Sequence, residues 1–481
     1  MMIDYSNKVC LAPMVRSGEL PMRLFALKNN CDLVWTPEYI DKKIITTKRI
    51  ENKELGTIDY ITRSSNNTTD VVVFRKHPLE TGKLIFQMGS SDPSIAVDAA
   101  LHVIQDVDGI DLNCGCPKHF SIHSKMGAEL LKDPELLCSI LINLVEKVGK
   151  PNNKPISAKI RLLPNFEKTK GLIEKILSTG ISNLTIHCRT PIMRNRQDPI
   201  WNYLPKLIPM IQDLGVNLIL NGNFQSRDDL KSVQEALKNF KLSIMIAEAV
   251  EANPSILSST PKVQKFNVAE IAELGMKYLH FSGAKFMILN MIPGKSKWYQ
   301  ELSRLKNWDD MMKKIDEMIN DNDTNDKINF IMNKNNQKVN LLNVEEFKKL
   351  MRQRGELMKL FNDKWDEEKM LDDLNDALPE NNKEQQKQKQ KGKKNKKNKK
   401  ANQNGNQKEE EKIKTEDQSA NSHQAEAISK QVKAEKSSKE AVTDTEHTVV
   451  DNENDSTTKK HNPLDTITNE NEPNRKKVKV N

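Results

Sequence analysis

The residue whose setting most suggests chemistry is a cysteine, Cys116. It lies in the segment DLNCGCP from Asp111 to Pro117, where a short apolar run ends in Asn, Gly and Pro. These turn-forming residues predict the end of a strand, and Ser124–Leu137 then predicts a helix. A thiol in a loop at a strand end can serve as an acid or a nucleophile, whereas a structural cysteine would pack in the interior. The rest of the chain must decide between these interpretations.

Further candidate residues, most of them polar or small, follow other apolar segments in the same way. They stand where eight predicted strands end, and a lone His or Lys there could also be structural. The candidates are Pro13, Met14, Val15, Glu38, Gln87, Asn113, Lys159, Arg161, His187, Arg189, Asn221, Gly222, Asn223, Ala247 and Glu248. Working groups of parallel barrels collect at the carboxyl ends of the strands, so their repetition favours one shared site.

The residue types at these strand ends suggest a heteroaromatic, phosphorylated ligand. Lys159 and His187 can stabilise negative charge, while Gln87 and Asn113 offer the donor and acceptor that suit an amide or imide edge. Small residues in NGN and IAEA, after the seventh and eighth strands, leave backbone N–H groups for a phosphate. Flavin mononucleotide (FMN) meets both requirements.

A regular alternation of short apolar and helical segments supplies the scaffold. The eight strand candidates are VCLAPM from Val9, DLVWTPEYI from Asp32, KLIFQMG from Lys83, GIDLNCG from Gly109, PISAKIRL from Pro155, NLTIHCR from Asn183, NLILNGN from Asn217 and SIMIAEAV from Ser243. This pattern predicts the α/β class and a (β/α)8 TIM barrel over residues 1–260, with an open doubly wound sheet as the alternative. Alternating residues around SNNTTD predict a β-hairpin inserted at about 57–77.

The pattern changes after Pro254 to helices without strands. Apolar residues at three- and four-residue spacing predict helices over Asn267–Asn290, Lys297–Asn320 and Val344–Asp373, and hence an all-helical domain over 261–375. Residues 376–481 lack Phe, Trp and Tyr and predict a disordered, low-complexity tail. Its lysine-rich cluster Lys391–Lys400 could contact nucleic acid, act as a nuclear signal, or simply be solvated.

Composition limits the remaining possibilities. The net charge is +9, but 23 basic and 19 acidic residues of the tail contribute +4 of it, so charge alone does not establish RNA binding. Six cysteines without a signal peptide or a membrane-spanning apolar run indicate a reducing compartment, cytoplasmic and/or nuclear. The Cys114–Cys116 pair has no second Cys or His pair at ligand spacing, so no metal site is expected.

The ordered motifs resemble the tRNA-dihydrouridine synthases, specifically the eukaryotic branch that acts on uridine 20 of the D-loop. The motifs are LAPMVRSGELPMRLFA, FQMGSSDP, DLNCGCPKHFSIHSKMGAELL, KIR, IHCRT, NGN and ANPSI, in order over residues 9–257. The resemblance implies an FMN enzyme that reduces a uridine in tRNA with NADPH (or NADH), with Cys116 as proton donor and the helical region binding tRNA. The family commonly has an Arg near the flavin phosphate where this chain has Glu248.

That resemblance gives each candidate an expected role. The cofactor-binding residues would be Pro13, Met14, Val15, Glu38, Gln87, Lys159, His187, Asn221, Gly222, Asn223, Ala247 and Glu248, and the substrate-binding residues Asn113, Arg161 and Arg189. Two other functions stay open: an FMN-dependent oxidoreductase of a free pyrimidine, and a noncatalytic RNA-binding barrel. A helical domain and a basic tail disfavour the first, and Cys116, Lys159 and His187 together disfavour the second. We expect a monomer.

Overall fold

A computed structural model describes residues 3–64, 69–118, 124–331 and 349. All of these residues belong to one compact unit that spans Met1–Leu378. The predicted helix Val344–Asp373, apart from Lys349, and the predicted tail at 376–481 lie outside the described residues.

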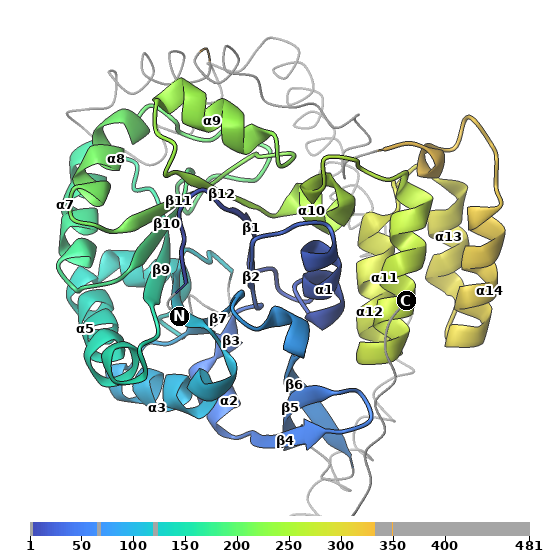
Figure 1. Ribbon diagram of the computed structural model, residues 1–481, viewed down its shortest axis with the longest axis horizontal. Coiled ribbons are helices and arrows are strands. Elements are labelled where there is room, and N and C mark those ends of the chain that lie inside the picture. Colours follow the sequence, from blue (N-terminus) through green and yellow to red (C-terminus); the bar gives the residue numbers. More distant parts are fainter. Residues whose placement is uncertain (1–2, 65–68, 119–123, 332–348, 350–481) are drawn as a thin grey trace, which may run out of the picture. The chain divides into compact units, whose positions relative to one another are not determined.

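The central element is a closed barrel of parallel strands, as predicted (Figure 1). Its order is β2-β1-β12-β11-β10-β9-β8-β7, and β2 pairs with β7 to close it. The strands are β1 (Val9–Leu11), β2 (Leu33–Trp35), β7 (Leu84–Gly89), β8 (Gly109–Cys114), β9 (Ile156–Arg161), β10 (Asn183–His187), β11 (Asn217–Asn221) and β12 (Ser243–Ile246). Closure excludes the open doubly wound sheet.

Helices surround the barrel on its outer side (Figure 1). They are α1 (Leu20–Lys28), α2 (Asp41–Ile45), α3 (Pro93–Val103), α5 (Pro134–Leu144), α6 (Lys150–Asn152), α7 (Phe166–Leu177), α8 (Leu204–Gln212), α9 (Asp229–Leu237) and α10 (Glu248–Ala252). The segment from Ser124 to Leu137 is not one helix, because a 3-10 turn at Gly127–Lys132 ends before Asp133 caps α5. Pro134 then occupies the first turn of α5, where its missing N–H has no cost.

Strand alternation separates an outer core from a polar interior. In β8, Ile110 and Leu112 belong to the large apolar cluster that includes the helices, so Asp111 and Asn113 face the inside of the barrel. The same alternation turns Lys159 of β9 inward. Apolar residues fill the interior beside β1, β2, β7, β11 and β12, namely Cys10, Ala12, Leu33, Trp35, Ile85, Ile219 and Met245. The polar half of the interior therefore comes from β8, β9 and β10.

The predicted hairpin is present and gains a third strand. Strands β5 (Thr57–Arg63) and β6 (Asp70–Lys76) pair antiparallel, and β4 (Lys48–Asn52) adds to β5. A two-residue strand, β3 (Tyr39–Ile40), pairs with β7 separately from β2, because Pro37 interrupts the predicted Asp32 strand.

The helical region forms a four-helix packing. Its helices are α11 (Gln264–Tyr278), α12 (Phe281–Met291), α13 (Lys297–Arg304) and α14 (Trp308–Ile319), so each of the two described helical predictions is divided in two. Gly275 allows α11 and α12 to cross closely, since a Cβ there would lie 2.7 Å from the Cβ of Ala284. No helix among residues 3–64, 69–118 and 124–331 has the length and apolarity needed to cross a membrane.

Several contacts join the helical region to the barrel domain, among them two made by arginine side chains. Arg75 donates from Nη1 to the Tyr278 carbonyl at 2.6 Å. The Arg16 guanidinium lies 3.8 Å from the ring centroid of Phe286, in the range of a cation–π contact. Arg16 directly follows Val15, which lines the central cavity, so the helical region contacts the first barrel loop.

Candidate active site

A cavity of about 1850 Å3 opens at the carboxyl ends of the barrel strands, and it brings together every candidate that the sequence singled out. The residues that line it include Pro13, Met14, Val15, Glu38, Gln87, Asn113, Cys116, Lys159, Arg161, His187, Arg189, Asn221, Gly222, Asn223, Ala247 and Glu248. Small-molecule pockets commonly measure about 300–1,000 Å3, so the volume exceeds what one small ligand needs. The separate cofactor and substrate roles of these residues stay predictions.

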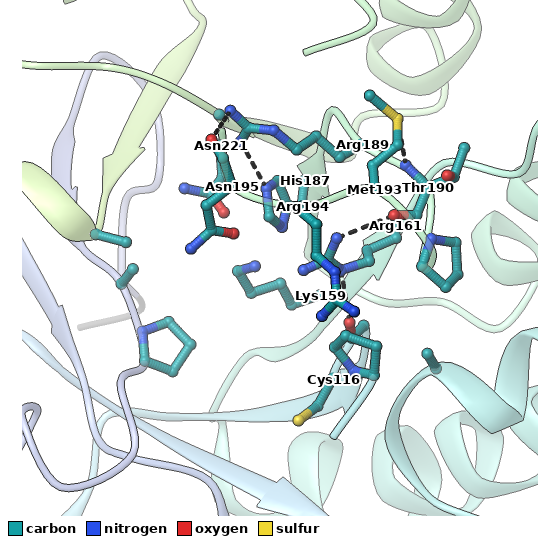
Figure 2. A pocket seen from close by; sticks show the side chains of 18 of the residues that line it. Cys116, Lys159, Arg161, His187, Arg189, Thr190, Met193, Arg194, Asn195 and Asn221 are labelled. Carbon is teal, nitrogen blue, oxygen red and sulfur yellow. Dashed lines mark hydrogen bonds between the residues drawn. The ribbon is translucent and has the colours of Figure 1, made fainter. Parts of the chain in front are cut away.

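Cys116 is held by a turn that Asn113 organises. The Asn113 Oδ1 accepts from the backbone N–H of Gly115 at 3.0 Å and of Cys116 at 3.1 Å. The Cys116 carbonyl in turn accepts from the Ala128 N–H at 3.0 Å. Figure 2 shows Cys116 and Lys159 side by side at the ends of the neighbouring strands β8 and β9, pointing into the same open space. The thiol is partly exposed there, in contrast to Cys114, which is buried in the outer core.

Arg161 joins the Cys116 loop to the loop after β10. Its Nε donates to the Gly115 carbonyl at 2.8 Å and its Nη1 to the Thr190 carbonyl at 3.0 Å (Figure 2). Only 8% of Arg161 is exposed. Burial, and the nearby Arg189 cation, lower the pKa of Arg161 to about 10. The group thus remains charged at neutral pH and braces two loops.

Arg189 holds the loop after β10 in a similar way. Its Nε donates to the Gln197 carbonyl at 2.7 Å and its Nη2 to the Asn195 carbonyl at 3.0 Å. Its Nη1 lies 3.1 Å from Nε2 of His187. A guanidinium has donors only, so Nε2 accepts and the neutral ring carries its proton on Nδ1. Burial and the neighbouring cations lower the pKa of His187 well below its usual range, which agrees with a neutral imidazole.

Lys159 is the cation of the cavity floor. Its burial among protein groups, aided by repulsion from Arg161, lowers its pKa to about 8, while Asp111 and Cys116 oppose that shift. Lys159 is half-buried, and an ammonium with a lowered pKa at this position is stabilised by any anion that enters the cavity. Perturbed groups of this kind cluster at functional sites.

The opposite wall carries polar groups of a different kind. Glu38 packs against β7 because Gly89 lacks a side chain, and a Cβ there would lie 2.5 Å from Oε1 of Glu38. Asn221 donates from Nδ2 to the Met245 carbonyl at 2.8 Å and so joins β11 to β12. Gly222 (φ 149°) and Asn223 (φ 60°) then turn the chain through the glycine-favouring region. This turn exposes Asn223 at the cavity beside Glu248.

Sequence reasoning missed several cations of the cavity wall. Among the lining residues, Lys and Arg outnumber Asp and Glu by eight to five, and five of these eight cations had not been singled out. The five missed cations are Lys118, Lys132, Lys168, Arg194 and Arg196. The available signal was the loop TPIMRNRQDP, which places Arg194 and Arg196 directly after a strand end.

The donor set suits a flavin phosphate ester. An excess of cations favours a phosphate, Lys159 favours an electron-rich ring, and the amides of Gln87 and Asn113 match an imide edge. Among the described residues no group of three or more His, Cys, Asp or Glu side chains could hold a metal ion. The arrangement supports acid chemistry by Cys116 beside a cavity whose cations would suit a negatively charged ring system.

Comparison with known proteins agrees with this geometry. The family model described as dihydrouridine synthase (Dus) matches residues 11–353. A tRNA-dihydrouridine(20) synthase of Saccharomyces cerevisiae, named for NAD(P)+, is 46% identical over 315 residues, which are 63% of this chain and 82% of that protein. Its counterpart from Schizosaccharomyces pombe is 46% identical over 272 residues, 56% of each chain.

More distant relatives act at other positions by their names. A human tRNA-dihydrouridine(20a/20b) synthase-like protein is 29% identical over 282 residues, covering 57% of this chain and 79% of its own. Among solved structures, a truncated 3-deoxy-D-arabino-heptulosonate 7-phosphate synthase from Thermotoga maritima matches 59% of this chain and 84% of its own with a TM-score of 0.29 and 13% identity. The match to the family over most of the chain confirms the sequence-based prediction: this chain belongs to the dihydrouridine synthase family.

Proposed function

We propose that this protein reduces uridine 20 of tRNA to 5,6-dihydrouridine, with FMN as bound cofactor and NADPH or NADH as reductant. The observation that carries the proposal is the convergence of Cys116, Lys159 and His187 on one cavity, in a chain of the dihydrouridine synthase family. The greater identity to the position-20 relatives, 46% against 29% for the 20a/20b relative, supports the choice of uridine.

The chain's own residues supply binding and proton transfer. Reduced FMN, when bound, supplies the hydride that C6 of the uracil accepts. Cys116 donates the thiol proton to C5, as a general acid, and its loop is fixed for this by Asn113 and Arg161. Lys159 stabilises negative charge on the ring system, and the neutral His187, oriented by Arg189, hydrogen-bonds at the same wall. The uridine must leave its stack to reach Cys116, at a cost of a few kcal/mol.

The alternatives fit the observations less well. A free pyrimidine would not need a cavity of about 1850 Å3 rimmed by the exposed cations Arg194 and Arg196. A noncatalytic barrel would have no use for a half-buried lysine at the cavity whose pKa is lowered to about 8. We further propose that the enzyme is a monomer without a metal. We also propose that it works in the cytoplasm and/or the nucleus, on the basis of its cysteines and its lysine-rich cluster Lys391–Lys400.

The test is direct reduction of defined RNA. Purified protein should show the absorbance of bound flavin. With NADPH it should introduce one dihydrouridine into an unmodified tRNA transcript, located by mass spectrometry, and none into a transcript with cytidine at position 20. Free uridine is the control substrate. A colourless protein that takes up no FMN, or reduction of free uridine at the rate of tRNA, would overturn the proposal.

A further inference from the structure

A buried carboxyl group below the cavity has no role in the chemistry above. Asp111 of β8 is fully buried, and each of its two oxygens accepts a side-chain hydrogen bond. Ser157 donates from Oγ to Oδ1 at 2.6 Å, and Gln87 donates from Nε2 to Oδ2 at 2.8 Å. The strand register places the three residues side by side, with Gln87 on β7 and Ser157 on β9. A buried carboxyl is costly, so its retention inside a barrel needs an explanation.

The carboxylate dictates which end of the Gln87 amide faces it. An ionised carboxyl group only accepts hydrogen bonds, so the Gln87 NH2 must turn toward Asp111. Burial raises the pKa of Asp111 to about 6, and at pH 7.5 the group is therefore mostly ionised. The Gln87 Oε1 accepts no hydrogen bond from the residues that the structure describes. The amide thus turns an acceptor toward the cavity that Gln87 lines.

Asn113 is oriented in the opposite sense. Its Oδ1 is occupied by the N–H groups of Gly115 and Cys116, so its Nδ2 is the end left for a ligand. The floor therefore offers an acceptor on β7 and a donor on β8. An N–H next to a carbonyl, the imide edge of an oxidised flavin, has the complementary order. Gln87 is only 1% exposed, at the bottom of the cavity. We therefore expect the ring of the cofactor to contact Gln87, and the uracil base that enters from solvent to bind above it.

We propose that Asp111 is a positioning residue, which fixes the Gln87 amide so that its oxygen accepts the imide N–H of the flavin ring. Asp111 is not among the residues that line the cavity, and it sets the orientation of the Gln87 amide. Its charge also acts on Lys159, which is why the effect must be tested against Gln87→Met. This inference rests on the proposed flavin enzyme, because the imide is that of the bound cofactor.

The experiment compares FMN with N3-methyl-FMN, which lacks the imide N–H, by fluorescence titration of FMN-free protein without tRNA. The parent should bind FMN more tightly by about five- to tenfold or more, the usual worth of a hydrogen bond that leaves a buried partner unmet when lost. Asp111→Asn lets the neighbouring amide take either orientation, so this preference should fall several-fold. In a Gln87→Met background, Asp111→Asn should have no further effect on the preference, because the shared partner is gone.

Asp106→Asn is the matched control. Asp106 is also buried and hydrogen-bonded, to Arg49 and Tyr60, but outside the barrel interior. That variant should lose stability and keep the parental preference for FMN. An unchanged preference in Asp111→Asn, or an equal further loss in the Gln87→Met background, would overturn the positioning role while leaving the flavin enzyme intact. Absence of FMN binding in the parent would instead overturn the proposed function.

If the Asp111→Asn variant does not fold, a second measurement tests whether Gln87 accepts the imide N–H. FMN labelled with 15N at the imide position should show, in the parent holoprotein, an N–H proton that is protected from exchange with water. Gln87→Met should lose that protection. An imide proton in the parent that exchanges as fast as in free FMN would show that no acceptor faces it, and the inference would fail.

Discussion

Replacing Arg161 with Lys tests whether the loop that carries Cys116 must be held rigidly. The parental guanidinium donates to the Gly115 carbonyl at 2.8 Å and to the Thr190 carbonyl at 3.0 Å from two different nitrogen atoms. Lysine keeps the charge but has one nitrogen on a flexible stem, so it can satisfy one carbonyl well and not both. The substitution therefore removes one charge-assisted hydrogen bond and the link between the two loops.

The size of the effect follows from that single bond. A hydrogen bond to a charged group contributes about 1.5–3 kcal/mol. If the whole loss falls on the placement of Cys116 in the transition state, turnover should fall by about 10- to 150-fold, since about 1.36 kcal/mol corresponds to a factor of ten. Binding of FMN and its reduction by NADPH should change little, because neither step uses the thiol.

The assay separates these steps. Single-turnover reduction of tRNA by NADPH-reduced enzyme should slow in Arg161→Lys, while the preceding reduction of FMN keeps its rate. Arg49→Lys is the control, since Arg49 likewise uses two nitrogen atoms, on Asp106 at 2.6 and 2.9 Å, outside the cavity. It should lower the melting temperature and leave turnover unchanged. If both variants turn over at the parental rate, the brace has no part in catalysis.

Other substitutions probe the acid, the floor cation and the tail. Cys116→Ala should retain FMN and tRNA affinity but lose about 10²- to 10⁴-fold in turnover, with Cys114→Ala as a nearly active control; equal activity would remove Cys116 from the mechanism. Lys159→Ala should weaken FMN retention and slow reduction by NADPH, and parental values for both would contradict its placement near the flavin. Because the pKa of Lys159 is lowered to about 8, the folded chain binds that proton less tightly than the unfolded chain. Urea unfolding of FMN-free protein should thus show a free energy of unfolding that rises between pH 8 and about 10, and the rise should be steeper in the parent than in Lys159→Ala. An equal dependence of that free energy on pH in both proteins would contradict the lowered pKa. Truncation after Leu378 should leave the melting temperature and FMN unchanged but weaken tRNA binding and flatten its salt dependence if Lys391–Lys400 contacts phosphates; an identical salt slope would exclude that contact.

The barrel was predictable because each strand carries its own signal. Near-continuous aliphatic runs such as Leu218–Leu220 indicate strands buried on both faces, and the polar residue after each run marks the carboxyl end. Since all parallel strands place that end at the same rim, the sequence already implied that Cys116, Lys159 and His187 converge. The order of the strands needed no long-range information beyond the regular alternation.

What the sequence could not supply was the partner of each charged group. The role of Arg161 in substrate binding stays a prediction, and the structure adds that Arg161 donates to carbonyls 46 and 29 residues away in the chain. Backbone carbonyls carry no residue signature, so no pattern predicts such a bond. The long helix expected over Asn267–Asn290 divides at Leu279. The sequence does not indicate this break, because both helices pack into the same core and the apolar spacing continues through it. By contrast, the interruption before α5 had a signal, the Asp133–Pro134 pair.

The cations of the cavity therefore divide into two groups by what they bind. Arg161 and Arg189 are buried, and their N–H groups hold the loops after β8 and β10. Arg194 and Arg196 are exposed on the loop that Arg189 holds. An exposed cation can attract phosphate at long range, but it would have to be ordered when RNA arrives. Because the buried pair already fixes the loop, ordering cost is reduced before binding, and the same brace that sets Cys116 also presents the phosphate-attracting side chains.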